Sequence, residues 1–82
     1  MAHHLSDIQT GESGRITGIE AGGDAGYRRK LLAMGLLPGT VFTVTRVAPL
    51  GDPVIIDVRG YALSLRRDEA RVLQIERIEK RG

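Results

Sequence analysis

The chain of 82 residues contains no cysteine and no tryptophan, and its only aromatic residues are Tyr27, Phe42 and Tyr61. Without thiols, disulfide bonds, Cys-ligated zinc, iron–sulfur clusters and thiol catalysis are all excluded. A chain of this size buries only about 60–65% of the surface that it exposes when unfolded. The fold therefore depends on a compact apolar core, without covalent support.

Long apolar runs are also missing. No run approaches the roughly 18–20 residues that a membrane span requires, and the N-terminus lacks the basic and apolar segments of a signal peptide. We therefore expect a cytoplasmic protein that reaches a membrane only through a partner. The length predicts one domain over residues 1–82, in which residues 1–4 and 79–82 are flexible ends.

Catalytic sets are absent as well. The only histidines, His3 and His4, are neighbours near the N-terminus, and neighbours in an extended chain point in opposite directions. No serine has a histidine placed for a nucleophilic triad, and the glycines near residue 14 lack the Lys-Ser/Thr of a phosphate loop. We expect no enzyme, no cofactor and no metal site. A weaker hypothesis is a metal sensor that uses His3 or His4 with a carboxylate, and the sequence leaves open whether these histidines are native.

Short alternating segments, separated by glycine and proline turns, predict a mainly β protein. We expect strands at residues 14–19, 40–47, 54–58, 61–65 and around 73–75. Residues 68–70 form a short turn or a single helical turn, and the charged tail from Glu76 is expected to fray. About five strands of this size favour a small, partly open barrel, with Phe42 and at least one tyrosine in its core.

A single helix is expected after the first strand, over residues 24–34. Asp24 can cap its N-terminus, and Gly35 can adopt the left-handed conformation that ends a helix, with Leu36 folding back behind it. A buried stripe is predicted at the i, i+4, i+7 spacing, formed by Tyr27, Leu31 and Met34.

Two surface features stand out. Arg28, Arg29 and Lys30 lie mostly away from that stripe, and the segment Pro49-Leu50-Gly51-Asp52 is a rigid turn with an apolar residue at its tip. A rigid apolar tip loses little conformational entropy on docking, so it suits protein binding. Leu50 could instead fold back over one end of the barrel. Arg28, Arg29 and Lys30, with Arg66-Arg67 at a strand end, could instead meet phosphates, so a nucleic-acid-binding or regulator-associated small barrel is the second hypothesis. The net charge of only +2 and the scarcity of aromatic residues argue against it.

Three blocks of the sequence resemble the ferrous iron transport protein A (FeoA) family. The first runs from Tyr27 to Gly39 (YRRKLLAMGLLPG), and the second from Arg46 to Pro53 (RVAPLGDP). The third covers Val58 to Gly60 and Leu63 to Arg67, followed by Glu69-Ala70. The blocks follow the family's order and spacing, and the resemblance covers roughly residues 5–78.

The resemblance implies a small SH3-like β-barrel with one inserted helix. It also implies an accessory protein of bacterial ferrous iron uptake that docks on FeoB, the membrane transporter with a cytosolic GTP-binding domain, and modulates it. The same domain type closes iron-dependent repressors of the diphtheria-toxin-repressor kind, but this chain lacks their DNA-binding and metal domains. We expect docking through Arg28, Arg29 and Lys30 and through Pro49, Leu50, Gly51 and Asp52. The marginal core and the apolar loop also favour weak self-association.

Overall fold

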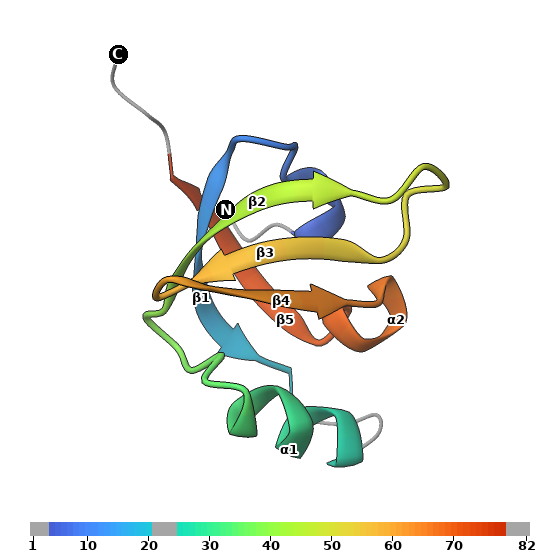
Figure 1. Cartoon of the computed structure of the whole chain (residues 1–82). Coiled ribbons are helices and arrows are strands. Elements are labelled where there is room, and N and C mark those ends of the chain that lie inside the picture. The colour runs from blue at the N-terminus through green and yellow to red at the C-terminus, as the bar shows by residue number, and fades with distance from the viewer. Residues whose placement is uncertain (1–3, 21–24, 79–82) are drawn as a thin grey trace.

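The computed structural model describes residues 4–20 and 25–78. It contains one 3-10 helix, η1, two α-helices and five strands (Figure 1). In chain order the elements are η1 (Leu5–Asp7), β1 (Ser13–Ile19), α1 (Ala25–Ala33), β2 (Val41–Val47), β3 (Val54–Val58), β4 (Tyr61–Leu65), α2 (Arg67–Ala70) and β5 (Leu73–Ile78). Each expected strand is present, and residues 67–70 form the single helical turn. No helix of the described residues is long and apolar enough to cross a membrane.

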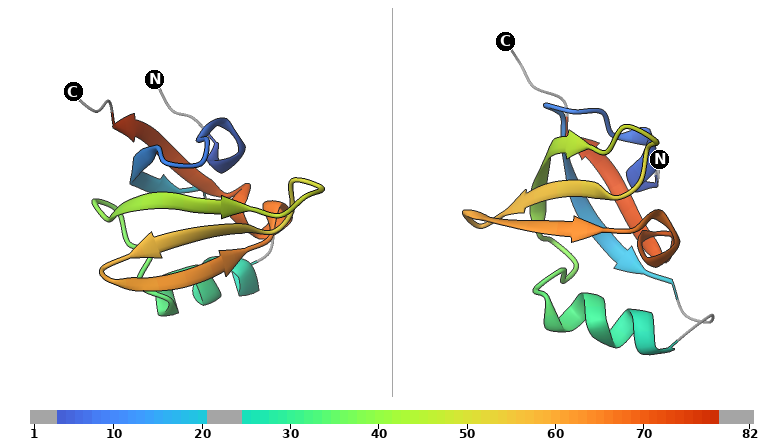
Figure 2. Two further views of the ribbon diagram at one scale, coloured as in Figure 1. Left: turned by 45° about the horizontal axis from the view of Figure 1, so that its top comes forward. Right: turned by 45° about the vertical axis from the view of Figure 1, so that its right-hand side comes forward.

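All five strands form one antiparallel sheet, in the order β4-β3-β2-β1-β5. The sheet curls on itself, and α2 occupies the connection between the edge strands β4 and β5 (Figures 1 and 2). Register shifts between Ile16 and Gly18 of β1 and between Val44 and Arg46 of β2 mark bulges. Bulges bend strands, which helps so small a sheet to enclose a core. The prediction of a small SH3-like barrel with an inserted helix is confirmed.

The core combines one face of each strand with residues of the helices. Alternation along β3 buries Val54, Ile56 and Val58, as the sequence predicts. Gly14 leaves room for the Phe42 ring, since a Cβ atom on this glycine would lie 2.7 Å from Cζ of Phe42. The fully buried side chains are Phe42, Ile16, Leu31, Leu36, Ile56, Leu65, Leu73, Ile75, Val44 and Val58.

Helix α1 ends as the sequence predicts. Gly35 has a φ of 89°, its N–H bonds to the carbonyl of Leu32, and the N–H of Leu36 bonds to the carbonyl of Leu31. These two bonds make a Schellman motif, which places Leu36 in the core. The predicted helix is slightly longer than the observed one, and the expected cap Asp24 lies outside the described residues.

Both tyrosines are on the surface, so the prediction of a tyrosine in the core is wrong. Tyr27 is 38% exposed and Tyr61 is 48% exposed. Only the C-terminal part of the α1 stripe reaches the barrel: Leu31 is fully buried and Met34 packs against the core, whereas Tyr27 lies a turn earlier. Tyr61 begins the edge strand β4, and its hydroxyl donates to the carbonyl of Met34 at 3.3 Å.

The expected fraying from Glu76 is also wrong for the residues that the structure describes. Strand β5 continues to Ile78, which pairs with Ser13 of β1. Glu76 pairs with Arg15, and their side chains form an ion pair of 3.3 Å across the outer face of the sheet. The charged segment is therefore held in the sheet by β1, because opposite charges at facing positions of neighbouring strands favour pairing.

Candidate functional site: a loop, two helices and a hollow

Titratable side chains are dispersed over the barrel surface. Within residues 4–20 and 25–78, no group of three or more histidine, aspartate and glutamate side chains could hold a metal ion. His4 is exposed directly before η1, and His3 lies outside the described residues. The hypothesis of a metal sensor at these histidines therefore stays untested. Three features form the candidate interaction surface: the β2–β3 loop, the helices α1 and α2, and a hollow beside them.

Residues 48–53, named the proline loop, connect β2 to β3 and project from the barrel (Figures 1 and 2). The N–H of Gly51 bonds to the carbonyl of Ala48 at 2.7 Å, which closes a turn with Pro49 at its second position. The N–H of Ala48 bonds in turn to the carbonyl of Pro53 at 3.1 Å, and the Asp52–Pro53 peptide is cis.

Leu50 occupies the tip of the proline loop and is 93% exposed. Of the large apolar side chains that the structure describes as exposed, it is by far the most accessible. The alternative that Leu50 folds back over one end of the barrel is therefore wrong. A leucine so exposed contributes almost nothing to the core, so its substitution can change binding without changing folding.

The proline loop is attached to α2. The carboxylate of Asp52 accepts the backbone N–H of Arg67 at 3.0 Å, which satisfies one of the free amides at the start of that helix. A methyl group added at Gly51 would lie 3.4 Å from Nη1 of Arg67, so the guanidinium lies against the loop backbone. Asp52 thus has a structural role, and its carboxylate is not a free surface charge.

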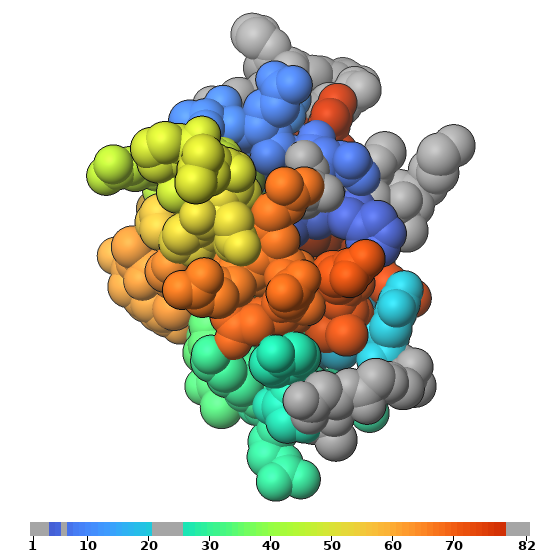
Figure 3. All heavy atoms as spheres, turned by 90° about the vertical axis from the view of Figure 1, so that its right-hand side faces the viewer, coloured from blue at the N-terminus to red at the C-terminus, as the bar shows by residue number. Residues whose placement is uncertain are grey.

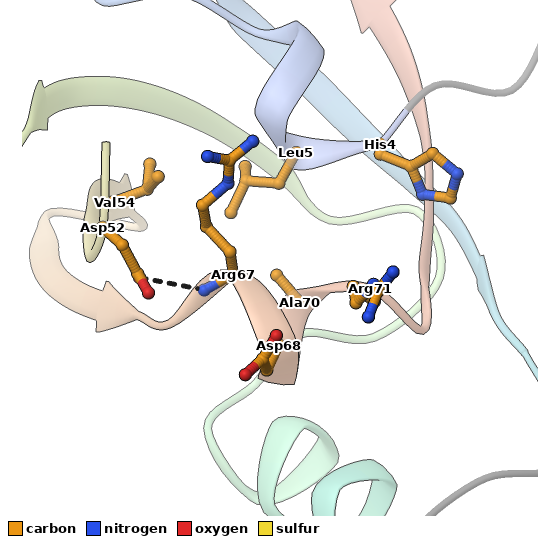
Figure 4. A pocket seen from close by; sticks show the side chains of 8 residues that line it. All are labelled: His4, Leu5, Asp52, Val54, Arg67, Asp68, Ala70 and Arg71. Carbon is orange, nitrogen blue, oxygen red and sulfur yellow. Dashed lines mark hydrogen bonds between the residues drawn. The ribbon is translucent and has the colours of Figure 1, made fainter. Parts of the chain in front are cut away.

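A hollow of about 600 Å³ opens between the proline loop, α2 and η1 (Figure 4). Apolar side chains of Leu5, Val54 and Ala70 line part of it. Its polar lining residues are His4, Asp52, Arg67, Asp68 and Arg71. The hollow joins apolar surface to charged groups of both signs.

Helix α1 is attached to α2 by an ion pair between Lys30 and Glu69. Glu69 is buried, and its second carboxylate oxygen accepts the backbone N–H of Arg66 at 3.3 Å. The hydrogen bond from Lys30 lowers the pKa of Glu69 below its ordinary value of 4.5, although burial acts in the opposite direction. Of the three basic residues predicted on α1, Lys30 is therefore paired with an acidic side chain of α2, whereas Arg28 and Arg29 are exposed.

The Glu69 contact makes stability depend on pH. Because the folded-state pKa lies below the unfolded value, the carboxylate stabilises the fold fully above pH 4.5. That contribution disappears as the pH falls through the lowered pKa. We expect Glu69→Gln to be less stable than the wild type at pH 7, and this difference to shrink on acidification. Urea unfolding between about pH 7 and pH 3 measures it.

Lys30→Gln provides the matched test of that pH dependence, because it removes the main cause of the lowered pKa while leaving the carboxylate in place. The two variants should flatten the acid side of the stability profile in the same way. Equal stability differences for Glu69→Gln at pH 7 and pH 3 would contradict the assigned role.

Arg28, Arg29 and Leu50, which the sequence proposes for docking, are exposed in the structure, but the sequence does not show how these segments are connected. Arg67, Asp68 and Arg71 belong to a run of mixed charge, a pattern that is typical of a solvated surface. Nothing local indicates that this run lines a hollow with the proline loop. A signal was present at Asp52-Pro53, since an aspartate next to a proline turn often accepts a backbone N–H, but its partner lies 15 residues away.

Comparisons with known proteins bear on the family and the fold. The family model of the FeoA domain matches residues 3–77. A protein of Porphyromonas gingivalis, described as a fusion of Fe(2+) transport protein A and the Fe(2+) transporter FeoB, is 38% identical over 74 residues, or 90% of this chain. The chain spans only 8% of the length of that relative.

Solved structures share the fold. The NMR structure of a FeoA-like protein from Clostridium acetobutylicum has a TM-score of 0.86 at 31% identity, covering 99% of this chain and 92% of that one. The crystal structure of a zinc-complexed FeoA from Stenotrophomonas maltophilia, described as a prokaryotic SH3 domain protein, has a TM-score of 0.77. It is 21% identical and covers 92% of this chain and 91% of that one, a level of identity that supports the fold alone.

Proposed function

Because the chain belongs to the FeoA family, which is associated with ferrous iron transport, we propose that it is an accessory protein of ferrous iron uptake. It docks on the cytosolic part of a FeoB-type membrane transporter and modulates that transporter. The observation that carries this proposal is the Porphyromonas gingivalis relative, in which a protein similar to this chain is fused to FeoB. Fusion raises the effective concentration of one module at the other, as expected for modules that work in contact.

Docking uses the proline loop and the exposed side of α1, through Pro49, Leu50 and Gly51 and through Arg28 and Arg29. The internal bonds of the proline loop fix the position of Leu50 before a partner arrives, so little conformational entropy is lost on binding. An apolar side chain that is almost fully exposed gains the most free energy from burial in an interface. Lys30 and Asp52 hold the elements of this surface together, since Lys30 pairs with Glu69 of α2 and Asp52 accepts the backbone N–H of Arg67.

We expect Leu50→Asp to weaken binding to the cytosolic region of the transporter at least about 30-fold, the effect of losing a strong interface residue. A charge placed at the tip would have to be buried unpaired in the complex. Calorimetry with the two purified proteins measures the affinity, and uptake of ferrous iron in cells measures the consequence.

The matched control is Leu37→Asp, the same change at a leucine that is also exposed but precedes the opposite end of β2. It should leave the affinity within about threefold of the wild type, since surface residues outside an interface contribute little. Equal affinities for Leu50→Asp and the wild type would exclude the proline loop from docking, and the transporter would then be contacted through another surface.

A further inference from the structure

Positive charge is concentrated on two helices. Helix α1 and residues 66–71 together hold six of the 12 Lys and Arg residues of the chain but only two of its ten Asp and Glu residues. The net charge of this part is +4, whereas the complete chain carries only +2. The small overall charge therefore conceals an asymmetric distribution, in which the remainder of the chain is acidic.

Five arginines lie in this part, and the charge of one of them, Arg66, helps to lower the pKa of Glu69. The other four have no acidic partner in the part of the chain that the structure describes. The ion pairs of the described residues are Arg15–Glu76, Lys30–Glu69 and Arg77–Glu12. The unpaired and exposed group, named the arginine face, consists of Arg28, Arg29, Arg67 and Arg71. Unpaired surface charges of one sign produce a field that attracts an oppositely charged partner.

The arginine face lies beside the proline loop. The Lys30–Glu69 ion pair joins α1 to α2, and the Asp52–Arg67 hydrogen bond joins α2 to the loop. Figure 3 shows the loop, α2 and α1 following one another over a single face of the molecule. Arg67 and Arg71 line the hollow next to that loop (Figure 4). A partner that contacts Leu50 would therefore meet the arginines at the same time.

We propose that this surface binds a protein surface rich in aspartate and glutamate, which surrounds an apolar depression for Leu50. The proposal rests on the proposed function, because the acidic surface belongs to the cytosolic part of the transporter. A partner that offers only phosphate groups fits less well, since it cannot bury the side chain of Leu50, which is 93% exposed beside the arginines. A nucleic acid or lipid headgroup also offers no apolar depression for the tip of the loop.

The two parts of the surface have different tasks in binding. Exposed arginines at the rim of an interface increase the association rate and make it depend on salt. A buried apolar residue mainly lowers the dissociation rate. Substitutions on the arginine face should therefore change the association rate constant, and Leu50→Asp should change the dissociation rate constant.

Stopped-flow kinetics with the full chain and the purified cytosolic region of the transporter test this division. Reversing Arg28 and Arg29 to glutamate, or Arg67 and Arg71 to glutamate, should lower the association rate constant about tenfold at low salt. Raising the salt from about 50 mM to about 500 mM should lower the wild-type rate constant by a similar factor. The dissociation rate constant should stay within about twofold.

The control is the double reversal Arg46→Glu and Arg59→Glu, which changes the net charge equally at two exposed arginines of β2 and of the β3–β4 turn. It should lower the association rate constant about threefold or less, because neither arginine belongs to the arginine face and only Arg46, two residues before the proline loop, lies near the docking surface in sequence. An equal decrease of the association rate constant in the control and in the arginine-face variants would overturn the proposed role of the arginine face. Net charge alone would then explain the effect.

The remaining outcomes separate the two proposals. Binding that is independent of salt and of all four arginines would overturn the acidic partner and leave docking on the transporter intact. No binding of the transporter region by the wild-type chain, even at low salt, would overturn both. A third result is that the arginine face binds duplex DNA or vesicles of anionic lipid more tightly than the transporter region, and loses that binding when the arginines are reversed. That result would overturn the proposal that the partner is a protein.

Discussion

Leu31→Ala is expected to lower the free energy of unfolding by about 2–5 kcal/mol, the range measured for buried leucines replaced by alanine. Among the α1 residues whose burial the structure describes, Leu31 alone is fully buried, and Met34, just beyond the helix, packs only partly against the core. A domain of this length has a total stability of only about 4–12 kcal/mol. The substitution therefore removes a large share of the stability, and α1 should separate from the barrel before the strands unfold.

Leu32→Ala is the matched control, because it makes the same chemical change at the next residue of the same helix. Leu32 is 36% exposed, so its substitution should cost about 1 kcal/mol or less. Alanine favours helices at least as well as leucine does, which excludes helix propensity as the cause of any large loss. Chemical denaturation measures both variants, and equal losses would contradict the anchoring role of Leu31.

Gly14→Ala is expected to destabilise the barrel by about 1–3 kcal/mol, although it adds a single methyl group to a strand. The new Cβ atom would lie 2.7 Å from Cζ of Phe42 and 3.0 Å from Cγ2 of Ile75, closer than carbon atoms approach in packed cores. The Phe42 ring is buried and rigid, so the strands themselves would have to move.

The same substitution at Gly18 provides the comparison. A Cβ atom there would meet Oε1 of Gln74 at 2.9 Å, and this amide is the far end of a flexible side chain on an exposed residue. We expect Gly18→Ala to change the stability by less than about 0.5 kcal/mol, since the glutamine can turn away. Thermal unfolding of the two variants decides the matter. Similar melting temperatures would show that the Phe42 ring relaxes, contrary to our expectation.

Features of the fold that depend on nearby residues were predictable from the sequence. Gly35 and Leu36 specify the end of α1, because a left-handed glycine followed by an apolar residue closes a helix on its own carbonyls. Alternation over residues 54–58 specifies which face of β3 is buried. The turn at residues 49–53 follows from its two prolines, whereas the sequence left open whether Leu50 at its tip is exposed or buried.

Features that depend on how far an element extends over the barrel, or on which distant segment it meets, were not predictable from the sequence. Helical spacing shows that Tyr27 and Leu31 share a stripe, but it cannot show that only the later residue reaches the barrel. The site depends on contacts between distant segments in the same way. Lys30 meets Glu69 across 39 positions of sequence, so a basic residue that looks free on its helix is paired in the fold. The arginine face appears only after this pairing is known.

The hydrogen bond between the Arg67 N–H and Asp52 makes a backbone amide of α2 sensitive to the state of the proline loop. Amide protons exchange with solvent when the local structure that protects them opens. The order of the loop is thus recorded at a backbone amide outside the loop itself. A partner that binds Leu50 and orders the loop should slow exchange of the Arg67 amide proton. A partner that moves the loop away from α2 should accelerate that exchange. The direction of that change distinguishes a partner that closes on this surface from one that remodels it.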